Sequence, residues 1–229
     1  MMAGMIIRLF YCIEYPVQPR DSYRYENIII QLEETGTISD KIAFFPLSLW
    51  ILKIPYHYWG YDIVKGGIVF NMLLGVTLIC LIVKTASNYI KDSKILFAIG
   101  LTAATNPMLI RFSCTLLREN TYLLLTFFSI LVLISYYKTK KIVHLIIAQM
   151  LAAFSTLCRL EGFELIIISY MVVFLAFDQT RTGIKKTVIH TTASLVILFA
   201  FSMLIEHSFF GKNIKIRDAF SKIDIDLLE

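Results

Sequence analysis

An aspartate at the start of a predicted amphipathic helix is the first residue whose type and position could do chemistry. Asp21 lies in the stretch PRDSYRYENIIIQLEETG, residues 19–36, where Pro19 breaks the preceding segment. A helix dipole favours an ionised carboxylate at the N-terminus, and such a carboxylate can accept a proton or bind a cation. The same spacing fits a plain structural role in which Asp21 or Ser22 is the N-cap. The spacing by itself leaves both interpretations open.

Two further turns carry ionisable residues between long apolar stretches. Arg118 and Glu119 occur in RFSCTLLRENTYLLL, and Arg159 and Glu161 occur in TLCRLEGFELI. Charged side chains at membrane depth are costly, so they usually have a function or a partner there. The simpler interpretation is that they are helix-end charges in contact with water and lipid headgroups. It fits Arg118 and Glu161 better than it fits Glu119 and Arg159.

The composition places these residues in an integral membrane protein. The chain has 229 residues, 57% of them hydrophobic and 17% charged, with a mean hydropathy of +0.70; a typical soluble domain has about 25% charged residues. A membrane core of ~30 Å requires about 20 apolar residues per helix. The opening run, 1–13, predicts a shortened first membrane helix. The clear candidates for full spans are 66–83, 95–112, 120–137, 142–158, 163–177 and 187–205. We therefore expect an all-α polytopic transmembrane bundle with about six or seven membrane helices.

The basic residues predict which helix ends face the cytoplasm. Three short connections are rich in lysine or arginine, and the connections between them mix signs, which is the positive-inside pattern. This pattern places the N-terminus and the loops 84–94, 138–141 and 178–186 in the cytoplasm. Asp21 and the two charged turns then face the extracytoplasmic side of the plasma (inner) membrane. The net charge of +5 reflects this topology and gives no reason to expect nucleic acid as a partner.

The first outer loop, residues 14–64, is predicted to lie against the membrane surface. Apolar residues recur at i, i+3, i+4 and i+7 from Tyr25 to Leu32, and Gly36 supplies a stop. This pattern predicts one amphipathic interfacial helix that is too polar to span. The following segment, DKIAFFPLSLWILKIPYHYWGYD, crowds aromatic residues of the kind found at the headgroup level. Loops this long are usually functional, and a docking platform for a lipid substrate fits this one better than a transport pathway.

The four cysteines show no metal-ligand spacing. They are Cys12, Cys80, Cys114 and Cys158. Three of them lie in or beside apolar runs, where cysteine behaves as a small hydrophobic residue.

Several segments, in this order along the chain, resemble a known family. They are a short helix ending in RL, RDSYRYENI followed by a Gly-Thr-Ile-Ser turn, FFPLSLWIL, WGYD, NPMLIRFSCTLLRENTYLLL and CRLEGFELII. Over about residues 7–175 they are similar to the membrane half of GT-C superfamily glycosyltransferases, of the glycosyltransferase family 39 or protein-mannosyltransferase-like group. The resemblance implies the N-terminal half of a GT-C fold, with a transmembrane domain at 1–211 and the start of a further C-terminal part at 212–229. Many relatives carry two adjacent acids where this chain has Asp21 followed by Ser22.

The resemblance implies sugar transfer from a polyprenyl-phosphate-linked donor to a lipid, glycan or protein acceptor on the extracytoplasmic face. Asp21 and Glu119 match the family's acids, and Arg159 matches the basic residue after the fifth helix. A guanidinium fork suits the leaving phosphate, and Asp21 is the candidate base for the attacking hydroxyl or amine. Direct displacement inverts the anomeric carbon. The other residues that the resemblance assigns to substrate binding are Tyr25, Arg118 and Glu161.

The cofactor and two other functional classes stay open. Glu119 either orients the acceptor or helps Asp21 to hold a divalent cation, and the sequence does not choose between these roles. A lipid-linked glycan flippase or transporter needs polar or broken helices at the bilayer midplane, whereas the middles of 66–83 and 120–137 are apolar. A non-catalytic scaffold subunit of a membrane complex also fits. The sequence does not specify the acceptor, or whether the sugar is a hexose or a pentose.

Overall fold

The computed structural model describes residues 2–14, 18–35, 51, 53, 57, 62–177 and 181–209. Its α-helices are α1 (Met2–Glu14), α2 (Arg20–Thr35), α4 (Ile63–Ser87), α5 (Ser93–Thr105), α6 (Pro107–Ser113), α7 (Glu119–Thr139), α8 (Ile142–Thr156), α9 (Phe163–Ala176) and α10 (Arg181–Phe209). A short 3-10 helix, η2 (Leu160–Gly162), precedes α9. No strand occurs in these described ranges, which confirms the all-α prediction.

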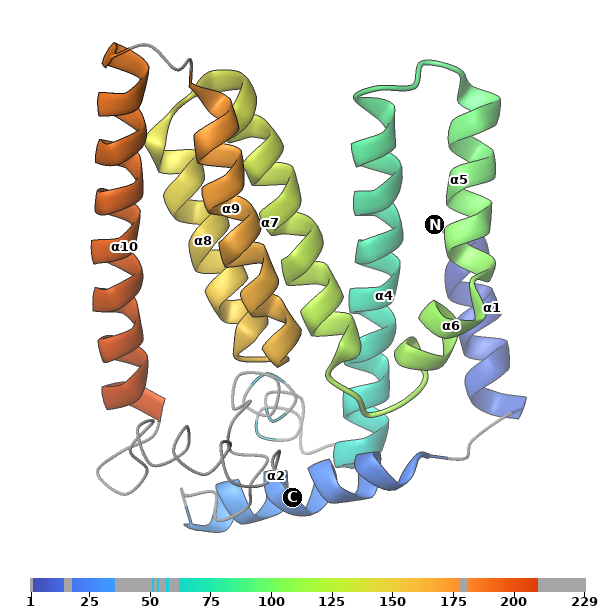
Figure 1. Cartoon of the computed structure of the whole chain (residues 1–229). Helices are drawn as coiled ribbons and strands as arrows, with labels where there is room; N and C mark the ends of the chain where they lie inside the picture. Colours follow the sequence, from blue (N-terminus) through green and yellow to red (C-terminus); the bar gives the residue numbers. More distant parts are fainter. Residues whose placement is uncertain are drawn as a thin grey trace, which may run out of the picture.

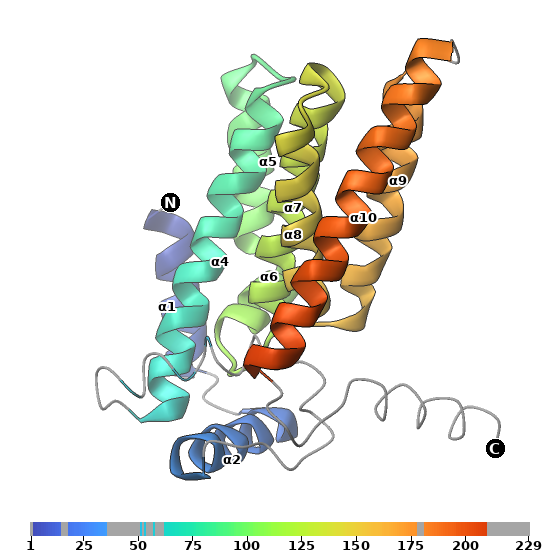
Figure 2. The same cartoon turned by 90° about the vertical axis from the view of Figure 1, so that its left-hand side faces the viewer.

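The long helices run side by side, and their connections gather at two opposite ends (Figure 1 and Figure 2). The lysine end holds the connections 88–92 and 140–141 and the start of α10. The site end holds α2, the connection 114–118 and the segment 157–162 with η2. The basic connections thus share one end and the mixed-sign connections share the other, as the charge pattern predicts. Which end faces the cytoplasm stays a prediction.

Two described helices are long and apolar enough to cross a membrane. They are α4, with 25 residues, and α7, with 21 residues, and they contain the predicted spans 66–83 and 120–137. The bent pair of α5 and α6 is a third span if the two helices are taken together. α8 has 15 residues, a length of about 22 Å against the ~30 Å membrane core. Helix length and composition therefore do not confirm the expected six or seven membrane helices.

The predicted span 95–112 is bent and interrupted. α5 ends at Thr105, α6 begins at Pro107, and the two helices differ in direction by 55°. Proline lacks an N–H and its ring clashes with a continuing helix, so Pro107 suits the first position of a new one. Asn106 caps that helix, since its Oδ1 accepts from the backbone N–H groups of Met108 and Leu109 at 3.0 and 3.2 Å. The break redirects the chain just before the connection 114–118.

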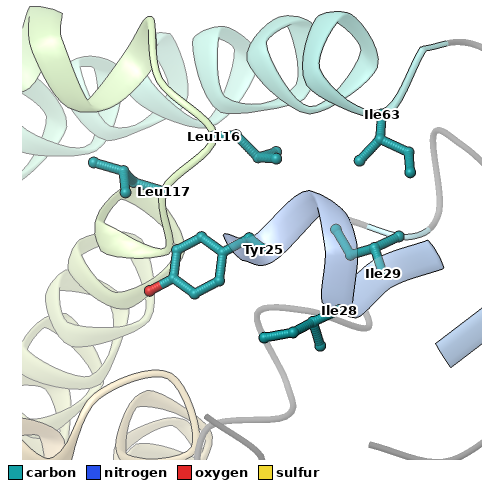
Figure 3. Packing of buried hydrophobic residues seen from close by; sticks show 6 residues of the cluster. All are labelled: Tyr25, Ile28, Ile29, Ile63, Leu116 and Leu117. Carbon is teal, nitrogen blue, oxygen red and sulfur yellow. The ribbon is translucent and has the colours of Figure 1, made fainter. Parts of the chain in front are cut away.

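α2 lies across the site end and packs its apolar face onto the bundle (Figure 3). Three of its side chains, Tyr25, Ile28 and Ile29, are buried in one cluster. Their partners are Ile63 of α4 together with Leu116 and Leu117 of the connection 114–118. Burial of each large apolar side chain contributes about 1.5–3 kcal/mol. The amphipathic helix is confirmed, but these residues face protein, whereas the sequence-based expectation placed them on the membrane surface. Gly36 and nearly all of the aromatic segment lie outside the described residues.

A buried arginine joins α1 to the α5–α6 bend. Arg8 is 0% exposed, and its Nε donates to Ser113 Oγ at 3.0 Å. Its Nη1 donates to the carbonyl oxygens of Gly4 and Ala104 at 3.0 and 3.3 Å. Gly75 of α4 leaves room for this contact, because a Cβ there would lie 2.1 Å from Ser113 Oγ. A close approach of helices through small residues and hydrogen bonds is typical of membrane bundles.

Similar contacts join the helices of the other half of the bundle. Ser129 Oγ of α7 donates to Ala148 O of α8 at 2.8 Å. Gln149 Nε2 of α8 donates to Ser169 Oγ of α9 at 2.9 Å. These polar side chains are buried and bonded across helices. They therefore hold the bundle together.

Candidate active site

The connection between α6 and α7, residues 114–118, is fixed by buried asparagines. Asn71 of α4 donates from Nδ2 to the carbonyl oxygens of Thr115 and Leu117 at 2.7 and 2.9 Å. Asn120, in the first turn of α7, donates from Nδ2 to Asn71 O at 2.9 Å. Both asparagines are 0% exposed. Irregular backbone inside a membrane protein needs such partners, because each unbonded buried carbonyl carries a desolvation cost. The two asparagines therefore fix the chain on both sides of Glu119.

The start of α2 is bound to the same connection. Gln18 Nε2 donates to Cys114 O at 3.2 Å, and Gln18 Oε1 accepts from Leu116 N at 3.1 Å. Ser22 Oγ donates to Leu116 O at 3.2 Å. The first outer loop and the α6–α7 connection, distant in sequence, are thus held together at the site end.

The prediction that Asp21 or Ser22 is the N-cap of α2 is wrong. The helix begins at Arg20, so both residues lie inside its first turn. The Ser22 hydroxyl, which could have capped the helix, bonds the neighbouring connection instead. Asp21 is exposed and lies in the first turn of α2.

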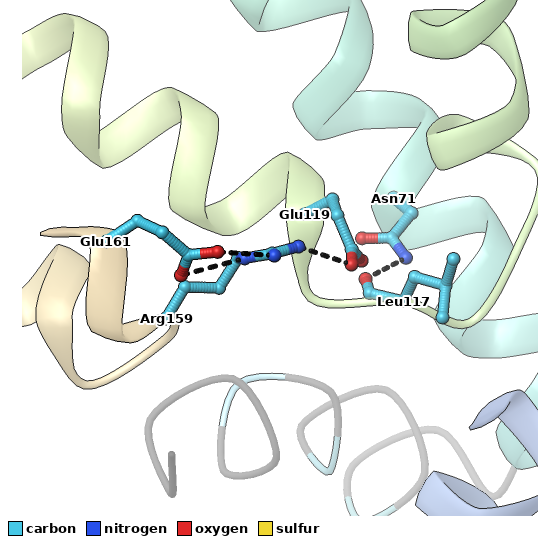
Figure 4. Close-up of polar contacts among 5 residues, drawn as sticks. All are labelled: Asn71, Leu117, Glu119, Arg159 and Glu161. Atoms are coloured by element: carbon cyan, nitrogen blue, oxygen red, sulfur yellow. Dashed lines mark hydrogen bonds and ion pairs between the residues drawn. The ribbon is translucent and has the colours of Figure 1, made fainter. Parts of the chain in front are cut away.

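Arg159 joins carboxylates from two different connections (Figure 4). Its Nη1 donates to Glu119 Oε1 at 2.9 Å, which links the segment before η2 to the start of α7. Its Nη2 and Nε donate to the two oxygens of Glu161 at 2.6 and 3.3 Å. The guanidinium carbon also lies 5.8 Å from the ring centroid of Tyr122. Glu119 and Arg159, predicted at separate turns, therefore belong to one cluster.

The ion pairs keep Arg159 and Glu161 charged. The hydrogen bond from Arg159 is the main cause of a lowered pKa at Glu161, and the same bond is the main cause of a raised pKa at Arg159. The side chains of Glu119 and Arg159 are 17% and 30% exposed, whereas that of Glu161 is 49% exposed. Glu161 therefore lies at the rim, where another anion could take its place. Glu119 Oε2 is buried and has no hydrogen-bond partner among the described residues.

Tyr25 of α2 interacts electrostatically with these charged residues. Its hydroxyl points away from Ile28 and Ile29 of its own helix (Figure 3). Its pKa is raised, chiefly by burial, and its electrostatic neighbours are Asp21, Arg118, Glu119 and Arg159. The structure thus brings the sequence-predicted residues to one end of the bundle, although no direct bond of Asp21 to Glu119 or Arg159 occurs in the part that the structure describes.

The described residues do not fit a divalent cation. Among them, no three His, Cys, Asp or Glu side chains converge as metal ligands. Glu119 has one oxygen on Arg159, and the other acid proposed for such a site, Asp21, is exposed on α2. We therefore derive no step through a metal ion.

The sequence did not point to Asn71, Asn120 or Gln18, and it pointed to Ser22 only as a helix cap. One signal was present: Asn71 interrupts the apolar run 66–83, and a polar residue inside a membrane segment usually has a defined partner. Nothing in the sequence indicates that this partner is a backbone 44 residues further along the chain.

Searches of curated proteins and of solved structures gave no match to this chain. A scan against protein-family models did give a match. The model described as dolichyl-phosphate-mannose-protein mannosyltransferase matches residues 45–205. The matched range includes Asn71, Glu119, Arg159 and Glu161, and it begins after Asp21 and Tyr25.

Proposed function

Since this chain belongs to the dolichyl-phosphate-mannose-protein mannosyltransferase family, we propose that it transfers a sugar from a polyprenyl-phosphate-linked donor to an acceptor at the site end. The proposal places the site end on the extracytoplasmic side of the plasma membrane, the N-terminus in the cytoplasm, and a lipid, glycan or protein as acceptor. The apolar α4 and α7 support a membrane enzyme.

The observation that carries the proposal is the cluster of Glu119, Arg159 and Glu161 next to Tyr25. Glu119 begins α7, Arg159 and Glu161 lie in the segment 157–162, and Tyr25 belongs to α2. Hydrogen bonds and ion pairs hold the start of α7 and that segment in place. Such an arrangement positions charged groups rigidly before a substrate arrives, which is how electrostatic catalysis avoids reorganisation during the reaction.

Arg159 is proposed to bind the phosphate of the donor. Its guanidinium carries five N–H groups, of which three are directed at Glu119 and Glu161. The remaining N–H groups, or those released when Glu161 leaves the rim, can form a fork on phosphate oxygens. The leaving phosphate gains negative charge as the glycosidic bond breaks, so a fixed cation stabilises the transition state more than the ground state. Arg118 adds a second cation in the same electrostatic surroundings.

Asp21 is proposed to act as the general base. It is exposed and lies one turn before Tyr25 on α2. In that position it can reach an acceptor hydroxyl or amine that approaches from the aqueous side. The acceptor gives its proton to the Asp21 carboxylate as it attacks the anomeric carbon, and the polyprenyl phosphate leaves toward Arg159. This single displacement inverts the configuration of the sugar.

A non-catalytic scaffold is the second candidate, and one observation favours it. Arg159 already has a carboxylate on either side, which is what a purely structural link between η2 and α7 requires. Transfer of labelled sugar from a polyprenyl-phosphate donor, in membranes that contain the full-length protein, separates the two candidates. The enzyme transfers label, and the scaffold does not. Hexose and pentose donors are assayed in parallel to identify the sugar.

A further inference from the structure

Two cysteines from distant parts of the chain meet at the site end. Cys12 lies in the last turn of α1, and Cys114 follows α6 directly. The Cys114 thiol donates to the carbonyl oxygen of Arg8 at 3.2 Å. In an α-helix the carbonyl of residue i faces the N–H of residue i+4. The sulfur of Cys114 therefore lies against α1 at the level of Cys12.

The second contact comes from Cys12 itself. Its thiol donates to Met72 Sδ at 3.8 Å. Met72 follows Asn71, whose side-chain amide donates to the carbonyl oxygen of Thr115 at 2.7 Å. Thr115 is the residue next to Cys114. Both cysteines thus lie at the junction of α1, α4 and the connection 114–118.

The chain holds both residues of the pair in place. Cys114 is 2% exposed, and its carbonyl oxygen accepts from Gln18 at 3.2 Å. Cys12 is partly exposed, so a small reagent can reach its sulfur. Disulfides form and persist on the extracytoplasmic side of membranes and are rare in the cytosol. The pair lies at the end that the proposed function assigns to the extracytoplasmic side.

We propose that Cys12 and Cys114 form a disulfide in the native membrane, by thiol–disulfide exchange with an extracytoplasmic protein or small molecule that carries a disulfide. The Cys12 thiolate attacks the donor disulfide, forms a mixed disulfide and releases one donor thiol. Cys114 then loses its proton and attacks the Cys12 sulfur, which expels the second donor thiol. The protein loses two electrons and two protons, and the donor disulfide is reduced to two thiols.

This bond would tie α1 to the connection that carries Arg118 and Glu119. The chain between the two cysteines includes α2 and α4, and closing so long a loop restricts the unfolded chain strongly. The disulfide is therefore expected to stabilise the site end and to raise the thermal midpoint of the oxidised protein above that of the reduced protein.

The test uses full-length protein in native membranes. The substitutions Cys80→Ser and Cys158→Ser leave Cys12 and Cys114 as the remaining cysteines. Membranes are quenched with acid, denatured, and treated with a maleimide–polyethylene glycol reagent before or after reduction. The proposal predicts no label without reductant and two labels after reduction. The matched control adds Cys12→Ser, after which Cys114 labels without reductant. In the unsubstituted protein, a peptide pair linked through Cys12 and Cys114 is expected by mass spectrometry, which covers the case that the serine variants fold poorly.

Two labels without reductant, together with no linked peptide, would overturn the proposal. The purified protein is then treated with oxidised glutathione. A disulfide formed at that stage shows that the pair was assigned to the wrong side of the membrane. Thiols that stay free show that the two cysteines do not have the geometry that a disulfide requires. The sugar-transfer assay on the same reduced protein reports on the proposed function independently, because the transfer mechanism uses neither cysteine.

Discussion

The two ends of the bundle both carry many charges, but they hold these charges differently. At the lysine end the lysines lie against aromatic rings: Lys140 Nζ lies 4.2 Å from the ring centroid of Tyr137, and Lys138 Nζ lies 5.0 Å from that of Tyr89. At the site end the contacts are hydrogen bonds and ion pairs, as in the bond from Arg159 to Glu119, 40 residues apart, and the bond from Asn71 to Thr115, 44 residues apart.

This difference indicates two uses of charge. Exposed charges contribute little to stability, and substitutions there usually cost about 0.5 kcal/mol or less. Their sum still sets the orientation of the chain in the membrane. Buried or partly buried charges with long-range partners fix geometry, and removing one partner leaves the other uncompensated. Substitutions of similar chemistry should therefore have unequal effects at the two ends.

The largest effect is expected from Asp21→Asn. Asparagine has nearly the same size and shape as aspartate, but it cannot accept a proton, so the rate of sugar transfer should fall about 10²–10⁴-fold. Transfer assays on membranes with equal amounts of inserted protein check this. Glu34→Gln, also exposed on α2, is the matched control and should keep full activity. Wild-type rates for Asp21→Asn would refute the assignment of Asp21 as the base.

Arg159→Lys should have the next largest effect. Lysine keeps the charge but loses the fork that contacts Glu119 and Glu161 together, so transfer should fall about 10²-fold while the protein still inserts. Lys140→Arg at the lysine end is the control and should leave the rate unchanged. If the two substitutions affected transfer equally little, Arg159 would be a helix-end anchor and the contrast between the ends would fail.

Asn71→Ala is expected to act on stability and position. It leaves the carbonyl oxygens of Thr115 and Leu117 without their donor, which should cost about 1–3 kcal/mol and reduce transfer by displacing Glu119. Thermal unfolding in detergent and the transfer assay measure both effects. Asn88→Ala, in an exposed connection at the lysine end, should change neither. An unchanged midpoint for Asn71→Ala would show that the connection 114–118 does not depend on these bonds.

Glu161→Gln should show a smaller, pH-dependent effect. Arg159 lowers the pKa of Glu161 in the folded protein from its ordinary value of 4.5. The stabilisation is therefore present above that ordinary value and is lost as the pH falls through the folded-state pKa. Since the Glu161 side chain is 49% exposed, the effect at neutral pH should be about 0.2–1 kcal/mol. The difference in thermal midpoint between wild type and variant should shrink on acidification, and a difference independent of pH would contradict the pairing.

The smallest effect on activity is expected from labels placed on exposed residues. Lys91→Cys at the lysine end and Asn27→Cys on α2, each in a background without the native cysteines, should leave transfer at the level of that background. An impermeant maleimide added to intact cells should label the cysteine at 27 and spare the one at 91. Labelling of both from outside would overturn the assignment of sides on which the proposed function depends.

The sequence by itself determined the class of the protein and the grouping of its charges. Its long apolar runs predict helices, because the backbone N–H and C=O groups of a segment in lipid must hydrogen-bond to each other. The helices α4 and α7 confirm this most clearly. The span 95–112 was expected to be continuous, and the Asn106–Pro107 break corrects it, although its cause is local because proline and a capping asparagine act within one turn. The alternation of lysine-rich and mixed-sign connections placed Asp21, Glu119 and Arg159 at one end, as the structure does.

The tertiary structure alone decided which of these residues touch. That Arg159 links Glu119 to Glu161, that Asn71 and Asn120 hold the connection 114–118, and that α2 buries Tyr25 against protein depend on how the helices pack. Helix packing is set by side-chain shapes and buried hydrogen bonds from segments far apart in sequence, for which periodicity and local propensity carry no information. The position of Cys114 near Cys12 has the same origin: each cysteine fits its own apolar run, and only the packing of α1 against α6 brings the Cys114 thiol to the last turns of α1.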